Sequence, residues 1–306
     1  MFSVTKNKVW LLLLPIVLIL AGVVGLIVNG GFKEDIDFAG GTSMQINIGK
    51  TLSGAERDEL GQTYAEAAGI EITPIVQTTG QNFDQVVVKS TVLTEEQQTA
   101  AFTAVKDKYG LADEAMMSVS SQDASYGNEM KFNTLLFSLI AAVLMLIYIS
   151  IRFEWKRGVM AVAALAINVL VMLSVYALFG IPLSTTFIAA ILTVLGYSIN
   201  DTIVIFDRIR ENMKYSKKET ATEITEKSIW QTMTRTINTS LTTLITIVVL
   251  YFMGATALKD FALPIIIGVV CGSYTSIFVA SPWWAAWVDA TKKEQPGKKK
   301  AAKAKA

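Results

Sequence analysis

The feature that most constrains this chain is a set of long apolar stretches separated by polar segments. The hydrocarbon core of a bilayer is roughly 30 Å thick, so about 20 apolar residues in a helix are needed to cross it. Six stretches reach that length, and they predict an α-helical membrane protein with six transmembrane helices. The predicted spans run approximately over Val9–Val28, Phe132–Ile151, Val159–Phe179, Leu183–Phe206, Ile237–Gly254 and Phe261–Val288. Pro264 and Pro282 fall within the last span, so the apolar pattern does not define its ends.

The composition narrows the chemistry that such a chain can perform. Hydrophobic residues make up 52% of the chain, charged residues make up 17%, and the net charge is +1. There is no histidine and a single cysteine, Cys271, which excludes an internal disulfide and a thiolate metal cluster and removes the commonest general base. The sequence contains no phosphate-binding loop, metal-ligand cluster or Ser-His-Asp order. We therefore expect a protein that is not an enzyme, uses no cofactor or metal, and has no nucleic-acid partner.

The first span, which follows Lys6 and Lys8, has some features of a signal peptide. Its apolar run is longer than the roughly 7–15 residues of a signal core, and no small-x-small cleavage site follows it. We therefore expect it to be a retained anchor.

Basic residues predict the orientation in the membrane. If the N-terminus is cytoplasmic, 19 of the 27 Lys and Arg residues lie in segments that face the cytoplasm. The short loops on the other side, Gly180–Pro182 and Ala255–Asp260, contain only Lys259. The positive-inside rule then places both termini in the cytoplasm and the segment between the first two spans on the opposite side.

That outer segment, residues 30–131, predicts a small folded domain with 16 Asp and Glu against 7 Lys and Arg. Its pattern reads βαββαβ, the order of an α+β ferredoxin-like domain, and an unrelated α/β domain is the alternative. Ser53 with Glu56, and Thr94 with Gln97, have the spacing of capping boxes at two helix starts. The predicted elements are strand Thr42–Ile48, helix Leu52–Ala68, strands Glu71–Thr78 and Phe83–Thr91, helix Thr94–Tyr109 and strand Ala115–Ser121.

The rest of the chain divides into an N-terminus with the first span (1–29), a five-span membrane domain (132–290) and a Lys/Ala-rich tail (291–306). We expect the tail to be disordered. The polar loop Glu211–Ile229 could form a short interfacial helix. Small residues at helical spacing in the last span indicate close helix packing, and these are Gly268, Cys271, Gly272 and Ser276.

The fourth span carries polar residues inside its apolar sequence, in the run GYSINDTIVIFDRIREN from Gly196 to Asn212. By helical rise, Asn200 and Asp201 lie roughly 8 Å inside the cytoplasmic end of the predicted span. A charge at that depth is costly, so such a residue is by default functional or paired. On a helix, Asp201 shares a face with Val194 and Tyr197 before it and with Ile205 and Arg208 after it. Two simpler roles stay open, because Asp201 could pair with Arg208 or cap a broken helix.

The fifth span begins with the run TRTINTSLTTLIT, which places Arg235 at the start of a stripe of polar side chains. A threonine stripe is often a packing face. Arg235 is different, because it can reach a carboxylate such as Asp201 on the preceding helix. Such a pair holds Asp201 ionised, and its loss lets the carboxylate protonate. This is the least that a proton-coupled transporter needs.

Taken together, these runs resemble the SecF family of protein-export membrane proteins. The run Gly196–Asn212 is similar to that family's fourth-span signature and is long enough to be specific. DIDFAGGT (Asp35–Thr42) resembles the stretch after the first span, SIWQTMTRTINTSLTTL (Ser228–Leu244) the entry to the fifth, and KDFALPIIIGVVCGSYTSIFVASP (Lys259–Pro282) the sixth. The similarity covers the chain apart from its termini, in the same order. Two positions depart from the pattern: Asp35 stands where the family usually has glycine, and Trp230 where relatives are often polar.

The resemblance implies a half-transporter of the resistance-nodulation-division superfamily in the bacterial inner (cell) membrane. It also implies pairing with SecD, association with the SecYEG channel and indirectly with SecA, and a role in late steps of preprotein export that draws on the proton gradient. By matching position, Asp201 and Arg235 correspond to intramembrane residues implicated in proton movement. Asp37, Gly40 and Gly41 correspond to the junction of membrane and outer domain.

We therefore expect proton coupling to involve Asp201 and Arg235, with Asn200 and Tyr197 beside them. Protonation of Asp201 would favour one of two arrangements of the outer domain. The proton would reach Asp201 along a water path shared with SecD. One alternative is an exporter half of the same superfamily, which needs substrate-sized outer cavities. Another is a scaffold that stabilises SecD and the channel, with Asp201 in a static ion pair.

Overall fold

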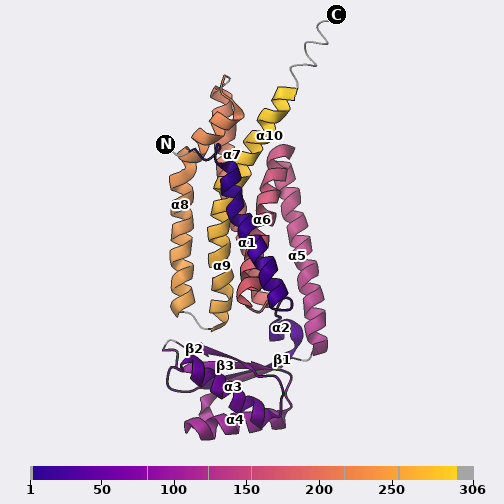
Figure 1. Ribbon diagram of the computed structural model, residues 1–306, viewed down its shortest axis with the longest axis vertical. Coiled ribbons are helices and arrows are strands. Elements are labelled where there is room, and N and C mark those ends of the chain that lie inside the picture. The colour runs from indigo at the N-terminus through magenta and orange to yellow at the C-terminus, as the bar shows by residue number, and fades with distance from the viewer. Residues whose placement is uncertain are drawn as a thin grey trace, which may run out of the picture.

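A computed structural model describes residues 3–80, 82–122, 124–152, 154–216, 218–253 and 256–294. Within these ranges six helices are long and apolar enough to cross a membrane, which confirms the predicted number of spans. The helices form an elongated bundle with a small α/β domain at one end (Figure 1). From residue 295 onward, the predicted disordered tail lies outside the described residues, whereas residues 291–294 belong to the last helix.

The sixth span is one continuous helical segment with a local change of winding. Pro282 has no N–H to donate to the carbonyl one turn earlier, and a π-helical turn ends at Ala280, two residues before it. Neither proline of this span ends it. The bundle helices are α1 (Lys8–Val28), α5 (Ala124–Arg152), α6 (Trp155–Phe179), α7 (Thr185–Tyr215), α8 (Ala221–Met253), α9 (Thr256–Thr275), the π-turn η2 (Ser276–Ala280) and α10 (Ser281–Glu294).

Two of these helices extend well beyond the predicted spans. α7 continues to Tyr215 and α8 begins at Ala221, so the predicted polar loop with a short interfacial helix is wrong for most of its length. Helical hydrogen bonds form equally well outside the apolar part of a span, so the apolar pattern gives a minimum helix length. Asp289 on α10 caps the start of α8 by accepting hydrogen bonds from the N–H groups of Ala221 and Thr222, both at 3.0 Å.

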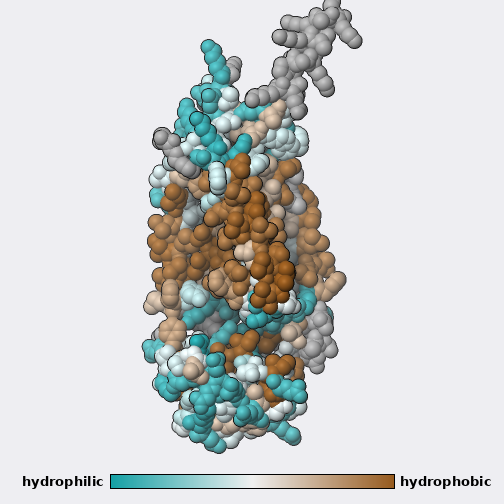
Figure 2. Space-filling view, viewed as in Figure 1, coloured by the Kyte–Doolittle hydropathy of each residue, from teal (hydrophilic) through white to brown (hydrophobic). Residues whose placement is uncertain are grey.

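The surface of the bundle carries a wide apolar band with hydrophilic residues at both ends (Figure 2). On α1, for example, Leu14, Val17 and Leu20 are more than half exposed, at 53%, 59% and 60%. Exposed apolar side chains on this scale indicate contact with lipid instead of water.

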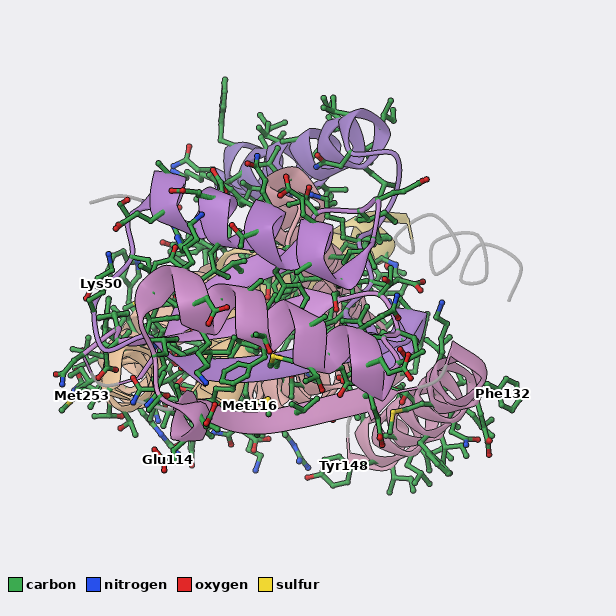
Figure 3. The ribbon with its side chains drawn as sticks, turned by 90° about the horizontal axis from the view of Figure 1, so that it is seen from below. Lys50, Glu114, Met116, Phe132, Tyr148 and Met253 are labelled. Atoms are coloured by element: carbon green, nitrogen blue, oxygen red, sulfur yellow. The ribbon has the colours of Figure 1, made fainter. Side chains whose placement is uncertain are left out.

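The α/β domain is built on a four-stranded antiparallel sheet with the order β2-β3-β1-β4. Two helices lie side by side on one face of the sheet, and the other face is turned toward the bundle (Figures 1 and 3). Met44, Leu60, Tyr64 and Phe102 are buried between the sheet and these helices. The elements are β1 (Gly41–Asn47), α3 (Gly54–Ala68), β2 (Ile75–Thr79), β3 (Gln85–Ser90), α4 (Glu95–Tyr109), a 3₁₀ turn η1 (Asp113–Ala115) and β4 (Met116–Gln122).

Both predicted capping boxes are present. The Ser53 hydroxyl accepts from the N–H of Glu56 at 3.4 Å, and the Glu56 carboxylate accepts from the N–H of Ser53 at 2.8 Å. Thr94 and Gln97 form the same reciprocal pair at the start of α4. These helix starts are therefore determined by local side-chain chemistry.

Candidate functional site

The carboxylate of Asp201 is buried between α7 and α9. Asp201 is 2% exposed, and the hydroxyl of Ser273 on α9 donates to its Oδ2 across 3.2 Å. α7 is unbroken here, so Asp201 does not cap a broken helix. Nor is it paired with Arg208, whose side chain in the described structure donates to Glu211 and Gln231 instead. Both simpler roles for Asp201 are therefore wrong.

Close packing of α7 against α9 closes this site. A Cβ atom added to Gly272 would lie 2.9 Å from both Cβ and Oγ of Ser198 on α7, and 3.0 Å from Nδ2 of Asn168 on α6. Glycine is therefore the residue that allows three helices to meet beside Asp201. The prediction that small residues in the last span mark close packing is confirmed at Gly272.

Two pairs of hydroxyl groups join neighbouring helices in this part of the bundle, and one of them contacts the carboxylate. Ser240 Oγ on α8 lies 2.6 Å from Ser273 Oγ, the group that contacts Asp201. A second pair, Thr202 Oγ1 on α7 and Ser276 Oγ in η2, is separated by 2.8 Å. Ser240 and Ser273 were not recognised in the sequence, because spacing along a helix does not tell which small residue faces a carboxylate on another helix.

Arg235 does not form the expected direct ion pair with Asp201. No hydrogen bond or ion pair joins the two among the described residues, although the charge of Arg235 acts on Asp201 through space. Arg235 is exposed and lines an open groove of about 620 Å³ between α7 and α8, with Asn200 and Gln231. Successive residues of a helix point roughly 100° apart, so Asn200 faces this groove while Asp201 faces α9.

Tyr197 makes no hydrogen bond to the carboxylate in the described structure. It is half-buried, and its hydroxyl accepts a long hydrogen bond of 3.5 Å from Thr243 on α8. Val194 and Ile205, which the spacing also places on the face of Asp201, are buried with it. The predicted face is therefore confirmed at these two residues, whereas Tyr197 and Arg208 have other partners.

The junction between the first span and the α/β domain contacts the start of α7. A short helix, α2 (Ile36–Ala39), contains Asp37, whose Oδ2 accepts from the N–H of Thr185 at 3.1 Å and from its hydroxyl at 2.6 Å. Gly40 ends this helix and Gly41 begins β1. Gly41 has φ +155°, and a Cβ there would lie 2.4 Å from a backbone oxygen of β3, so the turn into the sheet requires glycine.

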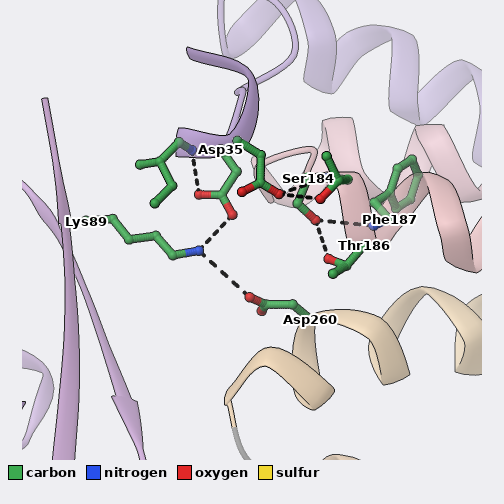
Figure 4. Close-up of polar contacts among 9 residues, drawn as sticks. Asp35, Lys89, Ser184, Thr186, Phe187 and Asp260 are labelled. Atoms are coloured by element: carbon green, nitrogen blue, oxygen red, sulfur yellow. Dashed lines mark hydrogen bonds and ion pairs between the residues drawn. The ribbon is translucent and has the colours of Figure 1, made fainter. Parts of the chain in front are cut away.

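A lysine on the sheet joins this junction to α9. Nζ of Lys89 on β3 lies 2.7 Å from Asp35 Oδ2 and 3.8 Å from Asp260 Oδ2 on α9 (Figure 4). Asp35 also caps α2, since its Oδ1 accepts from the N–H of Ile36 at 2.8 Å. The residue at the position usually occupied by glycine therefore makes two specific contacts. The sequence did not predict that Lys89 contacts Asp35 and Asp260, because the three residues are distant from one another in the chain.

The α/β domain is thus attached to the first turns of α7 and α9, the two helices that hold Asp201 and Ser273 further along. Among the described residues, no group of three His, Cys, Asp or Glu side chains is placed to hold a metal ion.

Comparison with known proteins identifies relatives over nearly the whole chain. Residues 101–290 match the family model described as "Protein export membrane protein SecD/SecF, C-terminal". Protein translocase subunit SecF of Alicyclobacillus acidocaldarius is 35% identical over 297 residues, which cover 94% of this chain and 92% of that protein.

Longer relatives match as well. Protein translocase subunit SecDF of Thermus thermophilus is 34% identical over 281 residues, covering 90% of this chain and 37% of that protein. A crystal structure of SecDF from Thermus thermophilus, described as a translocon-associated membrane protein, superposes with a TM-score of 0.80 at 30% identity. That superposition covers 94% of this chain and 38% of the SecDF chain, so this chain spans little more than a third of it.

Proposed function

Because the chain belongs to the SecD/SecF family of protein-export membrane proteins, we propose that it is a SecF-like translocase subunit that uses the proton gradient to promote late steps of preprotein export. In this proposal it works with SecD and the SecYEG channel, and indirectly with SecA. The SecDF protein of Thermus thermophilus supports the pairing with SecD, because this chain aligns with a third of that longer chain.

The observation that carries the proposal is the buried carboxylate of Asp201 between α7 and α9. An ionised carboxylate out of water is costly unless it is paired or hydrogen-bonded. The hydroxyl of Ser273 and the through-space charge of Arg235 support the ionised form. Protonation cancels the charge and with it the attraction between Asp201 and Arg235. Asp201 is therefore the group whose state a proton gradient can change.

The contacts that attach the α/β domain to α7 and α9 would couple protonation of Asp201 to movement of the domain. A change in packing between α7 and α9 would move their first turns, where Asp37 and Lys89 bind. Two arrangements of the domain, favoured by the two states of Asp201, would follow. Such movement can pull a preprotein or prevent it from sliding back.

The orientation and the outer domain belong to the same proposal. The distribution of basic residues supports a bacterial inner-membrane protein with both termini in the cytoplasm and the α/β domain outside. The element order βαββαβ and the sheet order β2-β3-β1-β4 support a ferredoxin-like domain. The groove that holds Arg235 and Asn200 supports a water path completed by SecD.

The decisive experiment is export into vesicles that contain this chain, SecD and the channel, with and without an imposed proton gradient. We expect Asp201→Asn to lose the stimulation by the gradient while still co-purifying with SecD. Glu71→Gln, which removes an exposed carboxylate of the α/β domain, is the control and should behave as the natural protein does. Normal gradient-driven export by Asp201→Asn would rule out the proton role.

Arg235 separates proton coupling from a scaffold role. Arg235 is exposed and makes no ion pair with Asp201 in the described structure, so Arg235→Gln should change the free energy of unfolding by less than about 0.5 kcal/mol. The same change should reduce gradient-driven export and proton flux, because the ionised form of Asp201 loses its nearby positive charge. Unchanged proton flux in vesicles carrying Arg235→Gln or Asp201→Asn would favour the scaffold.

A further inference from the structure

Asp201 is connected to α8 by a chain of hydroxyl contacts that the proposed function does not use. Ser273 Oγ lies 3.2 Å from Asp201 Oδ2, and Ser240 Oγ lies 2.6 Å from Ser273 Oγ. The chain ends at the backbone carbonyl of Thr236, which is 2.9 Å from Ser240 Oγ. It therefore begins at a titratable group on α7, crosses α9 and ends at an acceptor on α8 that cannot donate.

Counting protons shows that this series of hydroxyl contacts can be oriented in two ways. A serine hydroxyl has one proton to donate, and an ionised carboxylate can only accept. When Asp201 is ionised, Ser273 must donate to it and Ser240 must donate to Ser273. The proton of Ser240 is then no longer available to Thr236.

Protonation of Asp201 reverses the order. The new O–H is buried and needs an acceptor, because a buried donor without a partner is costly. Ser273 is the hydrogen-bonding partner of Asp201 in the described structure, so it becomes that acceptor and donates onward to Ser240. Ser240 then donates to the carbonyl of Thr236. The hydroxyl protons of the chain reorient without leaving their own oxygens, and the only proton gained is the one on Asp201.

We infer that Ser273 and Ser240 are positioning residues that form a hydroxyl relay, in which the direction of every hydrogen bond follows the protonation state of Asp201. This inference rests on the proposed proton-coupled function and adds how α8 senses the carboxylate. Because α8 also carries Arg235, the relay links the buried carboxylate to the helix that lines the open groove.

The helix segments packed around Asp201 are uncharged, so the relay is the polar connection from Asp201 to α8 in the described structure. The segments 159–179 of α6, 236–253 of α8 and 261–280 of α9 and η2 contain no Asp, Glu, Lys or Arg. Arg235 on α8 is a charged side chain that acts on Asp201 through space. The pair Thr202–Ser276 also joins two helices, but it has no hydrogen bond to Asp201 in the described structure.

Infrared spectroscopy of the full chain in lipid vesicles tests the relay. At acidic pH, subtracting the spectrum of Asp201→Asn isolates the C=O stretching band of protonated Asp201. We expect Ser273→Ala to shift this band to higher wavenumber, because the acid loses its acceptor. Ser240→Ala should shift it in the same direction by less, although Ser240 does not touch Asp201.

Matched variants separate a relay from general disturbance of the core. Ser273→Thr keeps the hydroxyl and should restore the band of the natural protein. Ser276→Ala removes a buried interhelical hydroxyl pair of the same kind outside the relay and should leave the band in place. A band unmoved by Ser240→Ala, or moved as far by Ser276→Ala, would overturn the relay alone. Absence of any Asp201 band at every pH tested would overturn the relay together with the proton role.

Discussion

Asp37 accepts two hydrogen bonds from Thr185, the first residue of α7, one from its N–H at 3.1 Å and one from its hydroxyl at 2.6 Å. A residue of the junction after the first span therefore caps the helix that carries the buried carboxylate. The side chain of Ser184 also caps this helix by accepting from the N–H of Phe187 at 3.2 Å. The start of α7 is therefore capped both by the residue that precedes it and by Asp37 on α2.

Removing the cap that Asp37 provides should destabilise the first turn of α7. For Asp37→Ala we expect a loss of roughly 1 kcal/mol, the usual cost of losing a helix cap, and faster amide hydrogen exchange at Thr185. Asp37→Asn keeps a side-chain oxygen as acceptor and should show a smaller effect. Equal exchange rates at Thr185 in the natural protein and Asp37→Ala would contradict a capping role.

Lys89 should stabilise the folded protein mainly because Asp35 is buried beside it. The two side chains are 11% and 9% exposed, while Asp260 is 37% exposed. Removing one partner of a fully buried pair costs roughly 3–5 kcal/mol, so on the order of 2 kcal/mol is expected for Lys89→Met at this partly exposed cluster.

A double-mutant cycle measures this dependence by thermal unfolding in detergent. Asp35→Asn retains an oxygen to cap α2 but removes the charge, so Lys89→Met/Asp35→Asn should be more stable than Lys89→Met alone. Additive losses in the cycle would show that Lys89 and Asp35 do not stabilise each other.

Gly272 should tolerate no side chain. A Cβ atom would lie 2.9 Å from Ser198, so Gly272→Ala must push α9 away from α7 and should cost about 1–3 kcal/mol. Gly196→Ala is the matched control, because a Cβ there meets nothing within 4 Å and alanine favours a helix. Melting temperatures of the two variants check the prediction, which fails if they are equally stable.

Acid should weaken the start of α3 through Glu56. The hydrogen bond from Lys50, followed by the interactions with Ser53, lowers the pKa of Glu56 from its ordinary value of 4.5 to about 2. Since the folded-state pKa is the lower one, this stabilisation is complete above pH 4.5 and is lost as the pH falls toward 2. Carboxyl NMR shifts of Glu56 should therefore titrate near 2.

Removing the lysine provides the matching test. Lys50→Met should raise the pKa of Glu56, because the largest cause of its lowering is the Lys50 hydrogen bond. Lys106→Met, which breaks an ion pair with Asp113 elsewhere in the domain, should leave the titration of Glu56 unchanged. A titration midpoint that does not move in Lys50→Met would contradict this cause.

Features that depend on a single segment of the chain could be predicted from the sequence. The six spans follow from apolar length, and the boxes at Ser53 and Thr94 follow from contacts three residues apart. Predicted element ends were less accurate where polar sequence continues a helix, as in the last turns of α7. Asp201 could be recognised as an unusual charge because the residues around it are apolar.

What depended on the tertiary structure is how the helices rotate and meet. The sequence by itself determined that a carboxylate lies within the fourth span, but not that it faces Ser273 while Arg235 faces an open groove. Nor could it reveal that Lys89 on the sheet binds Asp35 and Asp260. Burial in lipid and helix capping act on each segment separately, whereas rotation and contact between distant segments are decided by packing of the whole chain, at glycines such as Gly272.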